Sequence, residues 1–138
     1  MNKPWLKQYP NNLEEKLREL DNNSITDLLD SASYKFSNNT AFSSLNTDLS
    51  YKMLNLLSKR LAAYMQYLGV NKHTRVAIML PNLLTYPVSL FATYFCGGTV
   101  ININPLYKTR EIEHVLKDSD AEYIFVLDKS KPCFLSQN

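Results

Sequence analysis

The sequence predicts an α/β fold in which a partial parallel sheet is connected by crossover helices. Three short strand candidates alternate with two helix candidates over the second half of the chain. One of them, Val76–Leu80, is apolar at every position, which is typical of strands that a parallel sheet buries on both faces. Short links between strands and helices favour right-handed crossovers. With 138 residues, 45% of them hydrophobic, the chain can form one core.

The first predicted element is a helix that begins after Ser24. Ser24 and Asp27 fit the capping pattern in which a serine side chain accepts a backbone hydrogen bond at the helix start. Apolar residues follow at helical spacing: Ile25, Leu28, Leu29, Ala32 and Phe36. We expect this helix to stop near residues 38–39, a short strand over 40–45, and a turn over 46–48.

A second, longer helix is predicted from Ser50 to Gly69. Ser50 is its N-cap, and Gly69 is its expected end because glycine adopts the left-handed conformation without a Cβ penalty. Its expected buried stripe consists of Leu54, Leu57, Leu61, Met65 and Leu68.

The βαβαβ pattern occupies the remainder of the chain. After the first strand we expect a helix over 83–96, a strand over 99–103, a helix over 109–119 and a strand over 123–127. The helix over 109–119 is amphipathic and places Glu113 and Lys117 four residues apart on its outer face. Its expected inner residues are Ile112, Val115 and Leu116.

No charged residue occurs between Arg75 and Lys108. A membrane-spanning helix needs about 20 predominantly apolar residues, and the apolar helix candidate over 83–96 is shorter than that. Extending it would include Pro81-Asn82 on one side or Gly97-Gly98 on the other. We therefore expect a buried helix and no transmembrane segment, with a small membrane protein as the alternative.

Composition excludes several function classes. The chain has three glycines where average usage of about 7% would give roughly ten, so neither common glycine-rich phosphate loop can form. Two cysteines, Cys96 and Cys133, allow no disulfide framework and no cysteine-based zinc site. A net charge of +2 predicts no nucleic-acid partner. The first ten residues do not resemble a secretory signal, so we expect a cytoplasmic location.

Few side chains suggest catalysis. His114 on the last helix has no nucleophile paired with it in the sequence, and His73 lies in a polar loop. Asp118 and Asp120 are two positions apart and are expected on different faces of a helix end, which disfavours a carboxylate pair. Cys96 is expected to be an inert buried thiol.

The segment Asn102–Pro105 is more informative. It follows a predicted strand at the carboxyl edge of the sheet, where α/β proteins bind ligands. Asn102 and Asn104 share one strand face and could hydrogen-bond a ligand. The alternative interpretation is that they satisfy the chain as it turns into the next helix.

The N-terminal 23 residues are polar and Asn-rich. They contain one amphipathic stretch with Leu13, Leu17 and Leu20 on one helical face. We expect a surface helix packed on the domain, because the polar face mixes both signs of charge, whereas membrane-binding helices are usually basic.

Several motifs together resemble bacterial long-chain fatty-acid–CoA ligases, which belong to the AMP-forming adenylate family. The runs that carry the resemblance are Trp5-Leu6 with Tyr9-Pro10, Leu49–Tyr51, Leu80–Val88, Ile101–Tyr107 and Thr109–His114. The resemblance extends to about Asp128. Three features depart from the family pattern. Lys108-Thr109 stand where the family has Thr-Pro, which removes the helix cap unless Thr109 caps one residue later. Asp120 replaces a usual glycine and would strain its turn, and residues 130–138 look like an unrelated tail.

The resemblance implies a fold and an activity. It implies the first part of the large N-terminal domain of the adenylate-forming fold, with an extension over residues 1–23, a partial AMP-binding domain over 24–128 and a divergent tail over 129–138. Family members convert a fatty acid, ATP with Mg and coenzyme A into acyl-CoA, AMP and pyrophosphate. They use a phosphate loop, acidic residues and a C-terminal domain with no counterpart among these 138 residues. We therefore assign no catalytic, cofactor-binding or metal-binding residue, and expect a cytoplasmic or peripheral location on the inner face of a membrane.

Four functional hypotheses remain open. The chain is an inactive piece of such a ligase, half of a split ligase that a complementing chain restores, a module that binds an acyl chain or a partner without catalysis, or a small membrane protein. A three-strand piece of a larger sheet would expose an edge and an apolar face, which predicts marginal stability.

Overall fold

The computed structural model describes residue 8, residues 24–128 and residues 131–136. The expected helical face at Leu13, Leu17 and Leu20, and the motif formed by Trp5-Leu6 and Tyr9-Pro10, lie outside the described residues.

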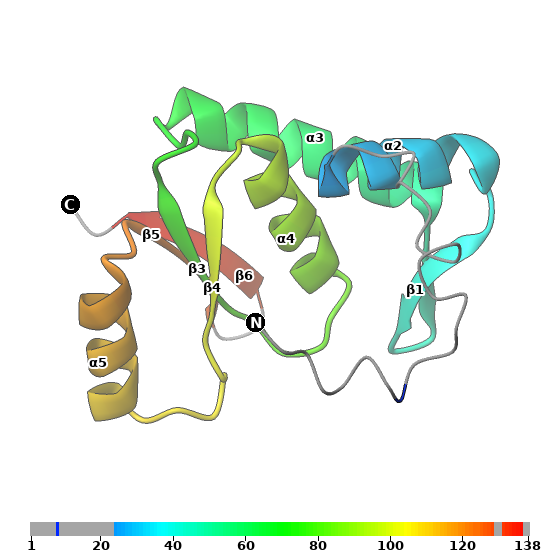
Figure 1. The fold of residues 1–138 in the computed structure, drawn as a ribbon. Coiled ribbons are helices and arrows are strands. Elements are labelled where there is room, and N and C mark those ends of the chain that lie inside the picture. Colours follow the sequence, from blue (N-terminus) through cyan, green and yellow to red (C-terminus); the bar gives the residue numbers. More distant parts are fainter. Residues whose placement is uncertain (1–7, 9–23, 129–130, 137–138) are drawn as a thin grey trace.

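The described chain forms a hairpin and a mixed sheet that has helices on both faces (Figure 1). The elements in order are α2 (Ile25–Lys35), β1 (Thr40–Ser44), β2 (Thr47–Ser50), α3 (Tyr51–Tyr67), β3 (Arg75–Met79), α4 (Thr85–Phe95), β4 (Thr99–Asn102), α5 (Thr109–Ser119), β5 (Tyr123–Asp128) and β6 (Lys131–Ser136). The large sheet has the order β4-β3-β5-β6, and its first three strands are parallel. The predicted βαβαβ unit is therefore confirmed.

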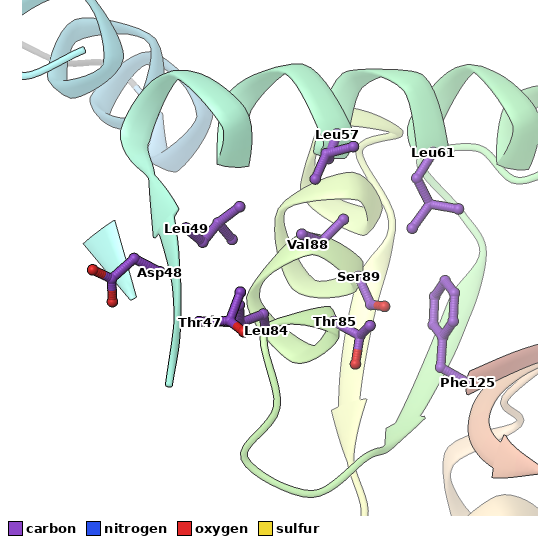
Figure 2. Close-up of a pocket in the computed structure, with 10 residues that line it drawn as sticks. All are labelled: Thr47, Asp48, Leu49, Leu57, Leu61, Leu84, Thr85, Val88, Ser89 and Phe125. Carbon is purple, nitrogen blue, oxygen red and sulfur yellow. The ribbon is translucent and has the colours of Figure 1, made fainter. Parts of the chain in front are cut away.

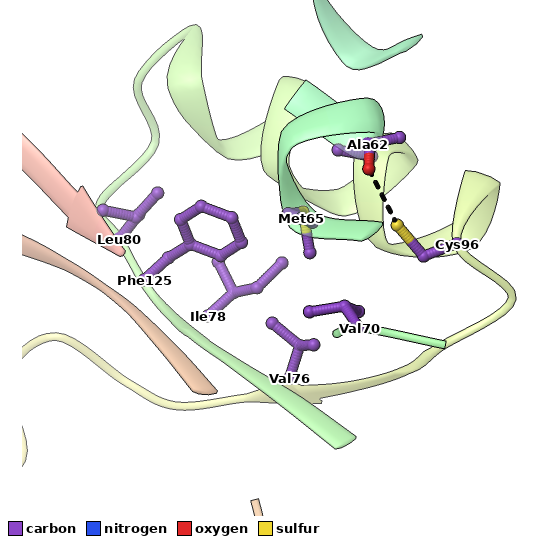
Figure 3. Packing of buried hydrophobic residues seen from close by; sticks show 9 residues of the cluster. Ala62, Met65, Val70, Val76, Ile78, Leu80, Cys96 and Phe125 are labelled. Atoms are coloured by element: carbon purple, nitrogen blue, oxygen red, sulfur yellow. Dashed lines mark hydrogen bonds between the residues drawn. The ribbon is translucent and has the colours of Figure 1, made fainter. Parts of the chain in front are cut away.

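The alternation of side chains along β3 divides the core into two layers. Val76 and Ile78 face α3 and α4, where they pack with buried Met65 (Figure 3). Ala77, between them, faces the opposite side and packs in a cluster that includes Ile112 of α5. Val76, Ala77 and Ile78 of this central strand are buried on both faces of the sheet, so these positions require apolar residues, whereas Arg75 at the start of the strand is exposed.

The hairpin β1–β2 corrects the turn expected over 46–48. The two strands pair antiparallel with Ser44 opposite Thr47, so the loop consists of Leu45 and Asn46 alone. Both loop residues have positive φ, 49° and 60°, as the primed hairpin turns require. Thr47–Ser50 is therefore a strand that the sequence analysis missed, because its Thr-Asp pair is also typical of turns.

Both predicted serine caps are present. The Ser24 hydroxyl accepts the backbone N–H of Asp27 at 3.1 Å, and the Ser50 hydroxyl accepts that of Met53 at 3.3 Å. The apolar face of α2 is buried less than expected. Leu29 is buried, but Ile25 and Leu28 remain 53% and 55% exposed.

Helix α3 buries a stripe that is shifted from the expected one. Leu54 and Met65 are buried as predicted, but Ser58 and Ala62 are the other buried positions. The helix ends as predicted at Gly69, whose φ is 100°. The N–H groups of Gly69 and Val70 donate to the carbonyls of Gln66 and Met65, which is the Schellman arrangement.

The uncharged stretch folds into strands and one helix of ordinary length. Helix α4 has 11 residues, and Cys96 just after it donates its thiol to the Ala62 carbonyl at 3.5 Å, which joins α4 to α3 (Figure 3). No helix among the described residues combines the length and the apolar character that a bilayer crossing needs.

Helix α5 spans the predicted residues but is capped differently. Thr109 is its first residue and Lys108 its N-cap, so the alternative in which Thr109 caps the helix one residue later does not occur. The Glu111 carboxylate accepts the Lys108 backbone N–H at 2.9 Å, which supplies half of a capping box. The predicted pair of Glu113 and Lys117 is present at 2.7 Å. Asp120 adopts φ 48° and ψ 39°, the left-handed conformation that its position predicted.

A fourth strand extends the predicted three-strand sheet. Backbone pairing places Lys131–Ser136 as β6, antiparallel to β5, with Tyr123 opposite Ser136. This strand lies within the segment expected to be a divergent tail, and it covers the edge of β5 that a three-strand sheet would leave open.

Candidate functional site

The strand order places a candidate ligand edge at the carboxyl ends of β3 and β5. Helix α4 connects β3 to β4 on one side of it, and α5 crosses the other face of the sheet to connect β4 to β5 on the opposite side of β3. The direction in which successive strands are added to the sheet therefore reverses at β3. Open α/β sheets bind ligands at such a switch point, because the loops there diverge and leave a crevice. The loop after β3, residues 80–84, leads from this edge into α4.

The two asparagines singled out in the sequence have separate partners at this edge. The Tyr86 hydroxyl donates to Asn102 Oδ1 at 2.8 Å, and Asn104 Oδ1 accepts the Leu106 backbone N–H at 3.0 Å. The interpretation in which these residues satisfy the turn therefore holds for Asn104. Asn102 instead holds the first turn of α4 against the end of β4. Sequence reasoning missed Tyr86, which carries no spacing signal that relates it to Asn102.

An apolar groove opens beside this edge, on the α3 and α4 face of the sheet (Figure 2). Its volume is about 490 Å³, within the range of small-molecule pockets. Ten residues line it: Thr47, Asp48, Leu49, Leu57, Leu61, Leu84, Thr85, Val88, Ser89 and Phe125. The lining comes from β2, α3, α4 with the residue before it, and β5. The sequence analysis missed the groove because it assigned Leu57 and Leu61 to a closed core.

The few polar groups of the groove do not form a charged binding site. No lysine, arginine or histidine lines it, and its one carboxylate belongs to Asp48. That carboxylate already accepts the Ser43 hydroxyl at 2.5 Å and the Thr40 hydroxyl at 3.5 Å. The Thr85 Oγ1 atom is buried and has no hydrogen-bond partner, so the groove contains one unsatisfied polar atom.

The titratable residues considered in the sequence do not come together. His73, His114 and Asp118 are exposed at separate places. Asp120 is also exposed, and its carboxylate faces Arg75 at 3.5 Å. Cys96 is buried, and desolvation raises the pKa of its thiol, which keeps it protonated and unreactive. None of these positions lines the groove.

A polar cluster joins α2 to α3 away from the groove. Asp30 accepts Lys59 at 2.5 Å and Asn55 at 2.7 Å. Desolvation pushes the pKa of Asp30 up, but the hydrogen bonds from Lys59 and Asn55 and the Lys59 charge outweigh it, so the pKa lies below its usual value. Lys59 also lies 5.1 Å above the Phe95 ring of α4. These contacts fix three helices relative to one another.

Two observations bear on the metal and phosphate sites that the resemblance implies for the family. Among residues 24–128 and 131–136, no three His, Cys, Asp or Glu side chains that are described lie close enough to hold a metal together. The chain's three glycines cannot make either common phosphate loop.

The sequence matches the model of a known protein family. Residues 29–137 match the family described as AMP-binding enzyme. Among curated relatives, the long-chain-fatty-acid–CoA ligases of Yersinia pestis and Escherichia coli O157:H7 are each 38% identical over 128 residues, and that of Bacillus subtilis is 36% identical over 126. These alignments cover 91–92% of this chain but only 22–23% of each relative.

Solved structures share the fold at lower identity. An artificially fused adenylation–PCP di-domain, NpsA-ThdA from Klebsiella oxytoca, superposes with a TM-score of 0.74 at 23% identity, covering 78% of this chain and 20% of that one. VinN in complex with L-aspartate superposes with a TM-score of 0.73 at 22% identity, covering 77% and 27%. The parallel sheet and its helices thus have the architecture of the N-terminal subdomain of adenylate-forming proteins. Because the family match spans well over half of the chain, this protein belongs to the AMP-binding enzyme family.

Proposed function

We propose that these 138 residues are the opening part of the AMP-binding domain of a long-chain fatty-acid–CoA ligase, a protein that joins a fatty acid to coenzyme A and releases AMP and pyrophosphate. The observation that carries this proposal is the 36–38% identity to such ligases over more than nine tenths of the chain. We further propose that the parent works in the cytoplasm or bound peripherally to the inner face of a membrane.

In this proposal the chain supplies scaffold and not chemistry. It provides the parallel strands, and the Tyr86–Asn102 hydrogen bond shapes their carboxyl edge. The segments that follow the matched region in the relatives would supply the groups that hold ATP, magnesium and coenzyme A. The 138 residues alone are therefore expected to be catalytically silent.

A chimera tests this proposal. The matched N-terminal part of the Escherichia coli relative is replaced by residues 1–138 of this chain, and palmitate-dependent pyrophosphate release is measured. We expect turnover by the chimera and none by residues 1–138 alone. The control is the relative without its matched part, which should be inactive. An inactive but folded chimera would overturn the assignment, and turnover by the 138 residues alone would overturn the scaffold role.

A second candidate function is a half-protein that a complementing chain restores, and the apolar groove favours it because it is an unfilled surface beside the sheet. Mixing the two separately purified parts distinguishes the candidates. Pyrophosphate release from the mixture supports a split ligase, whereas release only from the covalent chimera supports the first proposal. A third hypothesis, that the lone chain binds a fatty acid, predicts that palmitate occupies the groove.

A further inference from the structure

We propose that the outer side of α3 contacts the surface of an anionic lipid membrane. Helix α3 lies along one side of the molecule, with α4 and the sheet packed against its inner side (Figure 1). The inference rests on the peripheral location proposed above for the parent protein, and it names the contacting surface and the class of lipid. Six exposed residues define this surface, which we call the α3 outer face: Lys52, Leu56, Lys59, Arg60, Tyr64 and Tyr67.

The charges of α3 are all positive. No aspartate or glutamate occurs between Asp48 and Glu111, so the 17 residues of α3 carry three cations and no anion. Lys59 is paired with Asp30 of α2, whereas Lys52 and Arg60 form no ion pair with any described residue. The chain as a whole has a net charge of only +2, but its charges are segregated, and the solvent side of α3 is basic. An anionic bilayer attracts such a surface.

Large apolar and aromatic side chains lie among these cations. Leu56, Arg60 and Tyr64 follow one another at intervals of four residues, so they share one side of the helix. Leu56 is 39% exposed, Tyr64 55% and Tyr67 85%. Tyrosine is enriched at membrane–water interfaces because its ring is apolar and its hydroxyl polar, and long basic side chains extend past apolar neighbours toward the head groups. The α3 outer face thus combines apolar area with positive charge, the two features by which surface helices bind lipid.

Other partners fit this face less well. A second copy bound through the same face would place a surface with only positive charges against itself, which is repulsive. Nucleic-acid binding depends on many phosphate contacts, and the face offers two cations that have no ion pair among the described residues. An anionic bilayer is a plane of negative charge above an apolar layer, so it can accept the cations and the apolar side chains together.

Vesicle flotation measures this contact. The partition coefficient of residues 1–138 is compared between vesicles of phosphatidylcholine alone and vesicles that also contain phosphatidylglycerol, at low and at high salt. The test variant Lys52→Gln/Arg60→Gln removes two cations from the α3 outer face. The matched control Lys108→Gln/Arg110→Gln removes two exposed cations at the start of α5, on the opposite side of the molecule from α3 (Figure 1). Circular dichroism establishes that each variant is folded.

A second test variant, Leu56→Gln/Tyr67→Gln, removes apolar and aromatic area from the face without changing its charge. Both of its positions are exposed, so the core that α3 forms with α4 and the sheet is left intact. This variant separates a contact with the bilayer interface from attraction by charge alone.

The proposal predicts binding to the anionic vesicles that weakens at high salt and is much weaker with phosphatidylcholine alone. Lys52→Gln/Arg60→Gln should lower the partition coefficient by about thirtyfold, since each basic residue near an anionic surface contributes about fivefold. Leu56→Gln/Tyr67→Gln should lower it as well, whereas Lys108→Gln/Arg110→Gln should bind about as tightly as the unmodified chain.

Three results would overturn the proposal. The first is no binding to anionic vesicles at low salt. The second is an equal loss in the two charge variants, because net charge alone would then account for binding. The third is an unchanged partition coefficient in Leu56→Gln/Tyr67→Gln, because the apolar side chains would then not reach the bilayer.

The same measurement on the chimera separates this inference from the proposed function. The α3 outer face has to be accessible in the chimera, so Lys52→Gln/Arg60→Gln should weaken vesicle binding there too. An active chimera whose vesicle binding does not respond to these substitutions contradicts the membrane contact and keeps the ligase assignment. A folded but inactive chimera that loses vesicle binding through them contradicts the assignment and keeps the membrane contact.

Discussion

Substitutions at Asp120 test whether its left-handed backbone conformation affects the stability of the turn after α5. Asp120 ends α5 in the left-handed conformation, at a position where the family resemblance leads one to expect glycine. That conformation costs an ordinary L-residue roughly 1–2 kcal/mol, and aspartate less than most because its side chain can form local hydrogen bonds. Replacing Asp120 with glycine removes this cost, but it also gives the unfolded chain more freedom, which costs about 0.4–1 kcal/mol.

The ion pair with Arg75 changes this balance only slightly. Its atoms are 3.5 Å apart, and the Asp120 and Arg75 side chains are 81% and 49% exposed, so the pair contributes at most about 0–1 kcal/mol. We therefore expect Asp120→Gly to keep or raise the free energy of unfolding by up to about 0.5 kcal/mol. Asp120→Ala, which keeps the Cβ but removes the short polar side chain that makes aspartate more tolerant of this conformation, should lower it by about 1 kcal/mol.

Urea unfolding followed by circular dichroism measures this order. Arg75→Gln is measured beside the two variants to isolate the ion pair. The reasoning predicts that Asp120→Gly is more stable than Asp120→Ala by about 1 kcal/mol or more. Equal stabilities, or a more stable alanine variant, would show that backbone strain at Asp120 does not govern this turn.

Three further predictions concern the core and the polar cluster. The lowered pKa of Asp30 means that its contribution to stability is present above its usual pKa of 3.8 and is lost as the pH falls through the lowered value. The unmodified chain should therefore lose more stability than Asp30→Asn between about pH 5 and pH 2, and parallel pH profiles would contradict this. Met65 is fully buried between α3 and the sheet, so Met65→Ala should lower the free energy of unfolding by about 2–5 kcal/mol in the same urea assay, and a loss below 1 kcal/mol would contradict the packing. In a Cys133→Ser background, iodoacetamide should modify Cys96 far faster in urea than in buffer, because burial raises the pKa of its thiol and blocks access, whereas equal rates would place that thiol at the surface.

Local signals predicted much of the fold because they act over a few residues. Ser24 and Ser50 cap helices as expected, and Gly69 ends α3 through two backbone hydrogen bonds. The apolar run that begins at Val76 predicted a central strand, because burial on both faces excludes polar side chains from Val76, Ala77 and Ile78. The α/β class and the family followed from these patterns and from the motifs around them.

One missed feature lacks a local sequence signal, and the others depend on residues far apart in the sequence. The hairpin closes at Leu45 and Asn46, and leucine at positive φ gives no turn signal. The burial of Ser58 in place of the flanking leucines reflects how α4 packs on α3, which helical periodicity cannot show. The groove is where β2, α3, α4 and β5 meet, and the unpartnered Thr85 hydroxyl becomes visible only once these four elements are in place.

Calorimetric titration of the 138-residue chain with ATP and magnesium tests the central claim most directly, since the claim is that these residues supply scaffold without a triphosphate site. We predict no saturable heat for the lone chain and saturable binding for the chimera measured under the same conditions. Tight, stoichiometric binding of ATP by the 138 residues alone would contradict it.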